Sequence, residues 1–293
     1  MKALSLEKKY AIWGWIFVAP AALLIFAFSF YPMIQAFILS LQSGPGNTLK
    51  FSGARNYLRL LEDEQFHTAV RNVFIYLIFQ VPIMLILALI LASILNGQRL
   101  KFKGMFRALV FLPCAAGLVS AAIIFKSFVS IDGLFNRILL SMHLINSPVS
   151  WLTDSIYAKV IIIIVITWRW TGYNTIFYLA GLQSIESSIY EAARIDGANA
   201  VQQFFRITLP LLRPVILLTT IMSTNGTLQL FDEVRAMTNG GPGIATMTIS
   251  QYIYNLSFVY RPNFGYAAAV SYTILIMVAF LSFIQMKVGD KAQ

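Results

Sequence analysis

Residues 188–210, SIYEAARIDGANAVQQFFRITLP, are the longest polar-rich passage of the chain, and they separate two long apolar runs. Ser188 and Glu191 have the S-x-x-E spacing of a capping box, which predicts a short helix that begins at Ser188. The Asp196-Gly197 pair indicates a turn, because glycine adopts positive φ without a steric cost. The passage therefore predicts two short helices that are joined at a glycine.

The second of these helices is expected to be amphipathic and to end where Pro210 opens the next apolar run. Its predicted apolar face consists of Val201, Phe204, Phe205 and Thr208. Two helices joined in this way at a membrane surface can dock into a groove on a soluble partner. The alternative is an interfacial loop that only caps two transmembrane helices, and closure of the capping box would already account for Glu191.

The composition of the 293-residue chain is too apolar for a soluble domain. Hydrophobic residues make up 58% of it and charged residues 12%, and the mean hydropathy is +0.72. Soluble domains carry about 25% charged residues, so the chain is expected to cross a membrane several times. The formal net charge of +10 does not indicate nucleic-acid binding, because the positive-inside rule accounts for the excess of Lys and Arg.

The apolar runs predict an all-α fold, a polytopic membrane protein with six transmembrane helices in a single domain over residues 1–293. The first run is far longer than the core of a signal peptide, so it is expected to be a retained span. A turn is expected at 44–47, and Pro82 is expected to kink the second span. The expected spans are 10–41, 66–96, 106–129, 155–182, 211–235 and 264–287, with a loop at 186–210 between the fourth and the fifth.

The charges of the connecting segments predict the orientation of these spans. If the N-terminus is cytoplasmic, the inner segments hold twelve Lys and Arg against five Asp and Glu, whereas the outer segments hold nine against seven. Cytoplasmic segments carry the excess of Lys and Arg in membrane proteins. Both termini and the loop at 186–210 are therefore expected in the cytoplasm.

The spacing Glu-Ala-Ala, three residues, Gly, nine residues, Ile-x-Leu-Pro also resembles the EAA loop of bacterial ABC importer permeases. In that family the loop forms a cytoplasmic coupling helix that inserts into a cleft of the ATPase subunit. The resemblance assigns this coupling role to Glu191, Ala192, Ala193, Asp196, Gly197, Ile207, Leu209 and Pro210.

Other segments are similar to carbohydrate importer permeases, in particular those of maltose, other oligosaccharide and glycerol-3-phosphate systems. They are Phe111-Leu112-Pro113, Asp132-Gly133-Leu134-Phe135-Asn136, residues 179–185 and residues 238–242. Two features depart from the family: Glu186 stands where a proline is frequent, and no large extracytoplasmic insertion is present, so contact with a binding protein must use short loops.

The resemblance implies the type I importer permease fold in a bacterial inner membrane. The implied partners are a second, homologous permease in a heterodimer, two ATPase subunits, an extracytoplasmic solute-binding protein and membrane lipid, but no nucleic acid. ATP and Mg²⁺ would bind to the ATPase, and this chain would hold no cofactor.

Arg169 lies roughly 20 Å into the fourth span at 1.5 Å per residue, near the membrane midplane. A charge there costs roughly 2.5–3.5 kcal/mol on insertion scales, so the side chain is expected to face a cavity or an opposite charge. Aromatic faces stack on sugar rings and polar groups bond hydroxyls. A sugar path is therefore predicted along Arg169, Trp170, Tyr173, Asn174, Asn225, Gln229 and Asp232.

Structural alternatives exist for these residues. Arg169 can instead pair with an acid on a neighbouring helix; if it does contact substrate, an anionic sugar is favoured. Thr224 and Thr227 are expected to bond their own helix backbone. Asn225 and Gln229 share a helix face and can instead hold helices together.

No catalytic or metal site is predicted. His67 and His143 are the only histidines, Cys114 lies in an apolar run, and no G-x-x-x-x-G-K-[ST] motif is present. The chain is expected to be a non-enzymatic importer subunit for a sugar or oligosaccharide, with glycerol-3-phosphate or an acidic sugar as alternative substrates. An ion-coupled secondary transporter or channel, the alternative class, predicts paired acids inside the membrane, whereas the acids here lie mainly at span ends or in loops.

Overall fold

The computed structural model describes residues 6–44, 48–97 and 100–290, apart from the side chain of residue 290. It confirms the all-α prediction, because the only strands in these ranges are β1 (Gln42–Ser43) and β2 (Lys50–Phe51), an antiparallel pair. Most of the turn expected at 44–47 lies outside the described residues, as do three of the counted charges, namely Lys2, Arg99 and Lys291.

Packing divides the chain into two compact units: Met1–Glu62 with Ile253–Thr273, and Asp63–Tyr252 with Ile274–Gln293. Helix α15 (Phe264–Asp290) takes part in both and matches the sixth expected span. The prediction of one domain over residues 1–293 stays a prediction.

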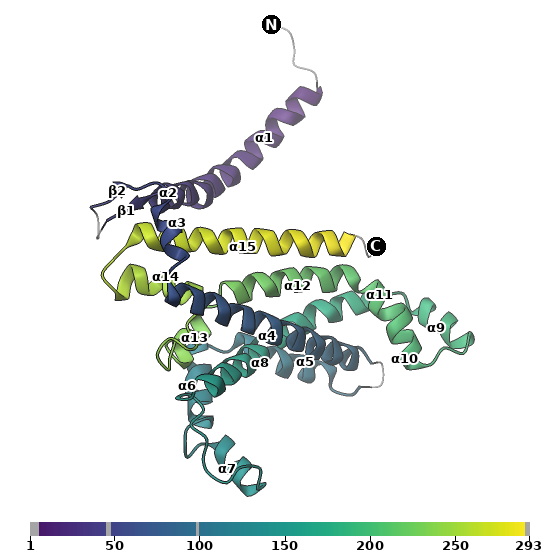
Figure 1. The fold of residues 1–293 in the computed structure, drawn as a ribbon. Coiled ribbons are helices and arrows are strands. Elements are labelled where there is room, and N and C mark those ends of the chain that lie inside the picture. Colours follow the sequence, from purple (N-terminus) through teal and green to yellow (C-terminus); the bar gives the residue numbers. More distant parts are fainter. Residues whose placement is uncertain (1–5, 45–47, 98–99, 291–293) are drawn as a thin grey trace. The chain divides into compact units, whose positions relative to one another are not determined.

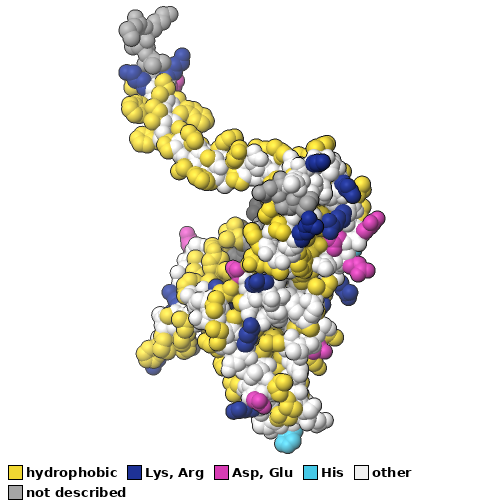
Figure 2. Space-filling view, turned by 90° about the vertical axis from the view of Figure 1, so that its left-hand side faces the viewer, with side chains coloured by type: hydrophobic (Ala, Val, Ile, Leu, Met, Phe, Trp, Pro, Cys, Tyr) yellow, Lys and Arg dark blue, Asp and Glu magenta, His cyan; other side chains and the backbone are white. Residues whose placement is uncertain are grey.

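The first unit contains the first expected span, and the structure confirms that it is helical. Helix α1 (Leu6–Ile25), the π-helical turn η1 (Phe26–Phe30) and α2 (Tyr31–Ser40) form one apolar segment of 35 residues, whose most apolar stretch is not buried at all. Figure 2 shows hydrophobic side chains all along this helix, next to the grey N-terminal residues. A helix that is apolar all round is suited to lipid. The unit also holds α3 (Arg55–Leu60) and η3 (Asn255–Val259), which the sequence did not predict.

The second unit is built on two long helices, α4 (Glu64–Asn96) and α8 (Ser155–Gln183), which confirm the second and fourth expected spans. Both begin with an aspartate whose carboxylate accepts two backbone N–H groups: Asp63 caps α4 and Asp154 caps α8. Helix α4 continues through Pro82, and the kink expected at this residue stays a prediction. Small residues let α8 approach α4 closely; the shared core consists of Ala88, Ala92, Leu95, Tyr178, Leu179, Leu182 and Leu212.

The third expected span, 106–129, is wrong as a single helix. The structure has α5 (Lys103–Ala115) and α6 (Leu118–Phe128), bent by 94° at the break between them. Pro113 lacks a backbone N–H, and both Ala116 and Gly117 are extended, with ψ of 140° and 134°. Apolar residues continue on both sides of this break, which is why the sequence did not reveal it.

The fifth expected span, 211–235, is also too long. Helix α12 (Arg213–Leu228) ends at Leu228, and the following acids belong to a separate helix, α13 (Asp232–Met237), which precedes α14 (Ile249–Tyr254). By length and composition, four helices in the described part of the chain can cross a membrane, or up to six if each bent pair forms one span.

A connecting segment joins α6 to α8. It contains α7 (Leu134–Ser141), and the buried Asn136 holds it together. The Asn136 amide nitrogen donates to the carbonyls of Ser130, Ile131 and Val149, and its oxygen accepts from Val149 N and Trp151 Nε1, at 2.9–3.3 Å.

We expect Asn136→Ala to loosen this segment, because it leaves a backbone N–H and several carbonyls without their partner. The local stability should fall by about 2–3 kcal/mol. Limited proteolysis of the purified protein should then cut within residues 129–154 much faster. Asn146→Ala, a change at an exposed asparagine of the same segment, should leave the cleavage rate as in the wild type. Equal rates for the two variants would contradict the role of Asn136.

Candidate functional site

The passage at 186–210, here called the elbow, forms a helical excursion beyond the ends of α8 and α12 (Figure 1). It comprises α9 (Ser187–Ile195), α10 (Ala200–Gln203) and the π-helical turn η2 (Phe204–Thr208). The short α11 (Leu209–Leu211) then leads into α12 with a bend of 66°. The prediction of two short helices joined at a glycine is confirmed: Gly197 lies between α9 and α10 with a φ of +80°.

The predicted capping box is wrong in its position. Helix α9 begins at Ser187, one residue earlier than expected, and its N-cap Glu186 makes no side-chain capping bond. Ser188 Oγ instead donates to a carboxylate oxygen of Glu186 at 3.3 Å. A capping box does exist in the elbow, but it starts α10, where Asn199 and Gln202 satisfy each other's backbone N–H groups at 2.9 Å.

The expected apolar face of the second helix is also wrong. Thr208 is buried and bonds the Tyr190 hydroxyl at 2.9 Å, whereas Val201 and Phe205 are 65% and 61% exposed. The π-helical turn adds a residue to the helix repeat, so side chains that share a face of an α-helix are separated here. The Tyr190–Thr208 bond therefore links α9 to η2 within the elbow.

Side chains at the tip of the elbow face outward. Ile195 is 87% exposed, and Val201 and Phe205 add apolar surface close by in the sequence. Of the residues assigned to coupling, Glu191, Ala192, Asp196 and Gly197 are exposed, and Ala193, Ile207, Leu209 and Pro210 are half-buried. Apolar and charged side chains of the elbow are therefore exposed, and other residues of the elbow do not bury them.

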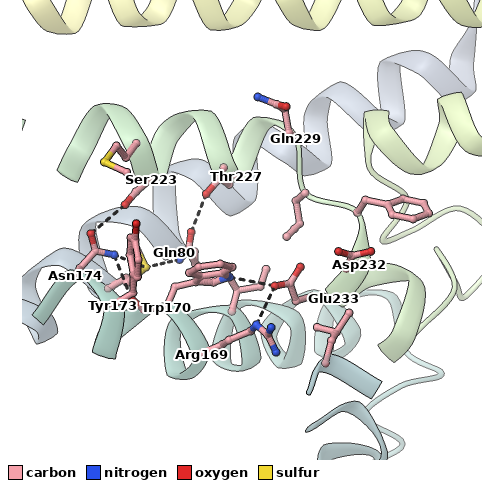
Figure 3. Close-up of a pocket in the computed structure, with 17 residues that line it drawn as sticks. Gln80, Arg169, Trp170, Tyr173, Asn174, Ser223, Thr227, Gln229, Asp232 and Glu233 are labelled. Carbon is pink, nitrogen blue, oxygen red and sulfur yellow. Dashed lines mark hydrogen bonds and ion pairs between the residues drawn. The ribbon is translucent and has the colours of Figure 1, made fainter. Parts of the chain in front are cut away.

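A cavity of about 690 Å³ lies in the second unit, between α4, α8, α12 and the segment that leads into α13 (Figure 3). Six of the seven residues predicted for a sugar path line it, namely Arg169, Trp170, Tyr173, Asn174, Gln229 and Asp232. Asn225 does not: its amide oxygen accepts a hydrogen bond from Ser282 of α15 at 3.2 Å. It holds two helices together, as the alternative reading had it.

Hydrogen bonds between polar side chains connect α4, α8 and α12 along the cavity wall (Figure 3). Thr227 Oγ1 donates to Gln80 Oε1 at 3.1 Å, and Ser223 Oγ donates to Asn174 Oδ1 at 3.5 Å. The Gln80 amide nitrogen donates to the sulfur of Met84 at 3.1 Å. Gln80, Met84 and Ser223 were missed by the sequence analysis, although a lone glutamine within the apolar run of α4 is a usable signal.

The expectation that Thr224 and Thr227 bond their own helix backbone is wrong at both positions. Thr227 bonds Gln80 on α4, and Thr224 accepts from Gln285 Nε2 on α15 at 2.8 Å. Thr219 and Thr220, one to two turns earlier, do bond their own helix, and Thr219 also donates to the Tyr178 hydroxyl on α8 at 2.9 Å.

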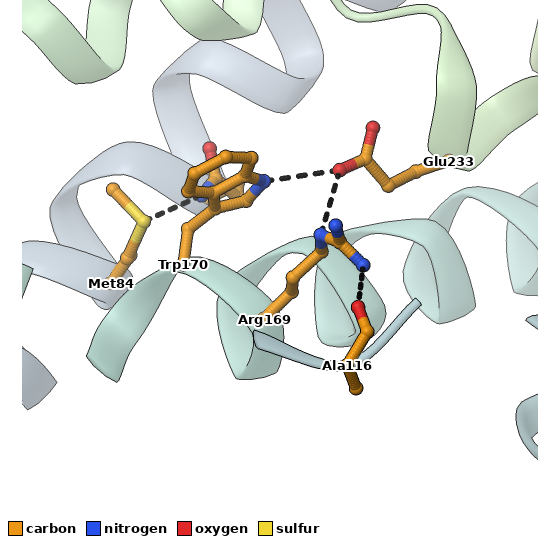
Figure 4. A network of polar contacts seen from close by, with 6 residues as sticks. Met84, Ala116, Arg169, Trp170 and Glu233 are labelled. Atoms are coloured by element: carbon orange, nitrogen blue, oxygen red, sulfur yellow. Dashed lines mark hydrogen bonds and ion pairs between the residues drawn. The ribbon is translucent and has the colours of Figure 1, made fainter. Parts of the chain in front are cut away.

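Arg169 belongs to a network at one end of the cavity (Figure 4). Its Nε lies 3.7 Å from Glu233 Oε1, and Trp170 Nε1 donates to the same oxygen at 3.0 Å. A second guanidinium nitrogen donates to the Ala116 carbonyl, 3.3 Å away at the α5–α6 break. Arg169 therefore pairs with an acid on another helix, which was the alternative reading, and it also lines the cavity.

The described residues contain no group of three or more His, Cys, Asp and Glu that could hold a metal ion. The arrangement is instead that of a passage: a polar and aromatic cavity between apolar helices, with an exposed elbow beyond them. Fold and site together define an integral membrane transport subunit.

Residues 69–288 match a protein family, and the chain belongs to it: the binding-protein-dependent transport system inner membrane components. It is 54% identical to a lactose transport system permease protein, LacF, of Rhizobium radiobacter over 96% of this chain and 95% of the relative. It is 34% identical to the trehalose/maltose permease protein MalF of Thermococcus litoralis, over 97% and 96% of the two chains. The arabinooligosaccharides permease protein AraP of Bacillus subtilis is 33% identical, over 94% and 88%.

Among solved structures, a chain of a bacterial ABC transporter that imports the acidic polysaccharide alginate has the same fold. The TM-score is 0.81 at 22% identity, and the match covers 98% of this chain and 97% of that one. This likeness confirms the expected importer permease fold.

Proposed function

We propose that this chain is the transmembrane subunit of an ATP-driven importer that takes a sugar or oligosaccharide from an extracytoplasmic binding protein. The observation that carries the proposal is the cavity, whose volume lies within the range of about 300–1,000 Å³ typical of small-molecule sites. Trp170 and Tyr173 offer faces on which a sugar ring can stack, and Gln80, Asn174 and Ser223 offer hydrogen bonds to hydroxyls. The name of the relative from Rhizobium radiobacter makes lactose the first substrate to test.

The elbow is the proposed contact with the ATPase. Its exposed apolar side chains suit a cleft on a soluble ATPase, and its glycine joint at Gly197 has open space around it. In this proposal two ATPases hold ATP and Mg²⁺, a second, homologous permease completes the path as a heterodimer, and this chain holds no cofactor. The termini and the elbow lie in the cytoplasm, in agreement with the charge bias of the connecting segments.

One observation supports a second candidate, an ion-coupled secondary transporter. Asp232 and Glu233 are adjacent acids that both line the cavity, and intramembrane acids are typical of proton and ion paths. Glu233 is already paired with Arg169, which favours the importer. Glycerol-3-phosphate and acidic sugars remain alternative substrates for the same importer.

Reconstitution tests these candidates. The chain, its homologous permease, the ATPases and the binding protein are placed in liposomes, and uptake of lactose, maltose and glycerol-3-phosphate is measured with and without enclosed ATP. We expect uptake of a sugar that requires ATP and the binding protein and is insensitive to collapse of ion gradients. Gradient-driven uptake by this polypeptide alone would establish the secondary transporter instead.

A further inference from the structure

Three charged side chains line the cavity. They are Arg169, Asp232 and Glu233, one cation and two anions. The cation lies beside one of these anions: its Nε is 3.7 Å from Glu233 Oε1, and another guanidinium nitrogen donates to the Ala116 carbonyl. The lining therefore presents a net negative charge to whatever enters.

Glu233 uses only half of its hydrogen-bonding capacity within the protein. Its Oε1 accepts from Trp170 and faces Arg169, while no described residue donates to its Oε2. Figure 4 shows this second oxygen pointing away from both Arg169 and Trp170. An ionised carboxylate accepts hydrogen bonds and donates none, so Oε2 is suited to a hydroxyl group and repels another carboxylate or a phosphate.

We propose that Glu233 is a specificity-determining residue that accepts a sugar hydroxyl through Oε2 and makes the path selective for uncharged sugars. Arg169 is a positioning residue: its Nε lies 3.7 Å from Glu233 Oε1, at a site where the Glu233 side chain is only 7% exposed. Trp170 fixes the orientation of the carboxylate and offers its ring to the same sugar. The inference rests on the proposed function, since it assigns a substrate class to the same cavity.

Uncharged and anionic sugars interact with the two carboxylates in opposite ways. A hydroxyl bond to a carboxylate is charge-assisted and stronger than a neutral one. An anionic sugar would meet two carboxylates in a poorly screened interior, where like charges repel much more strongly than in water. The sequence alone left two roles open for Arg169, contact with an anionic substrate and pairing with an acid, because it does not show which acid the fold brings beside Arg169.

Equilibrium binding to the purified complete transporter in lipid nanodiscs, without the binding protein, tests the inference directly. The probes are lactose and lactobionate, its carboxylate analogue. We expect the wild type to bind lactose at least about tenfold more tightly. Glu233→Gln keeps the shape but removes the charge, so it should weaken lactose binding about tenfold and bring the two dissociation constants within about threefold of each other. Glu64→Gln, the same change at an exposed position outside the cavity, should keep the wild-type ratio.

Arg169→Lys preserves the positive charge and should retain most of the selectivity, whereas Arg169→Gln should lose lactose binding. A further change to Glu233→Gln in the Arg169→Gln background should restore part of that binding, because it removes the uncompensated carboxylate. A purely structural role of the pair would not shift the lactose-to-lactobionate ratio.

Equal binding of both probes by the wild type would overturn the inference without any variant. A wild-type preference for lactose that Glu233→Gln leaves unchanged would also overturn it, while the proposed sugar import would stand. If the wild type neither binds nor transports any sugar, the proposed function itself fails.

Discussion

Replacing Gly172 with valine should prevent the protein from accumulating in a folded form. Gly172 lies on α8 where α5 crosses it, and a Cβ at this position would be 2.0 Å from the carbonyl oxygen of Val110 and 3.2 Å from Cα of Phe111. Both obstacles are backbone atoms, so no side-chain rotation can relieve the clash. Overpacking in a core typically costs about 1–3 kcal/mol, and a clash with backbone should exceed that range.

The measurement is the yield of monodisperse protein after detergent extraction, together with its thermal unfolding temperature. Two control substitutions distinguish the backbone clash from a milder contact and from no contact. Gly181→Ala meets only the flexible side chains of Leu212 and Val215, at 2.8 and 3.1 Å, and should lower the unfolding temperature moderately. Gly104→Ala on α5 meets nothing within 4 Å and should behave as the wild type. A Gly172→Val protein with wild-type yield and stability would show that α5 does not pack on α8 in this way.

Replacing Ile195 with aspartate should weaken the contact of this chain with the ATPase and abolish sugar uptake. Ile195 is 87% exposed at the tip of the elbow, so the fold does not need its side chain. A charge buried in an apolar interface without a partner is strongly unfavourable. We therefore expect copurification with the ATPase to fall at least about tenfold, and sugar-dependent uptake to be lost, while the unfolding temperature of this chain stays unchanged.

Leu61→Asp is the matched control, because Leu61 is also a strongly exposed apolar residue, at 72%, but lies in the connection between α3 and α4. It should leave copurification intact. If Ile195→Asp still retains the ATPase, or if both variants lose it equally, the elbow is not the coupling surface that we propose.

Some elements could be predicted because local chemistry defines them. The run of α8 is apolar over most of its length, and its predicted bounds agree with the helix to within a residue at its C-terminal end. Gly197 at the joint of the elbow was predicted from residue type alone, and it has the positive φ that glycine tolerates.

Other elements had no local signal. Pro113 and Gly117 stand within a run that remains apolar throughout, so the bend between α5 and α6 was invisible in hydropathy. The capping box was placed at Ser188 because the spacing fits there, yet the chain uses Asn199 and Gln202. Spacing shows which residues are able to cap a helix, whereas the path of the backbone decides which of them do.

The residues that line the cavity were also predictable only in part. Polar and aromatic residues of α8, together with Gln229 and Asp232, indicated a sugar path, but Gln80 on α4 joined it only through packing. Asn225 had the right chemistry on the right helix, yet it turns towards Ser282.

The amino-acid sequence by itself determined that this is a helical membrane protein with a glycine-jointed polar elbow, because transfer into lipid and backbone freedom depend on each residue's own side chain. Only the tertiary structure decided the partners. Trp170 and Glu233 are 63 positions apart in the chain, and the effect of the charge on Arg169 depends on which acid the fold brings beside it.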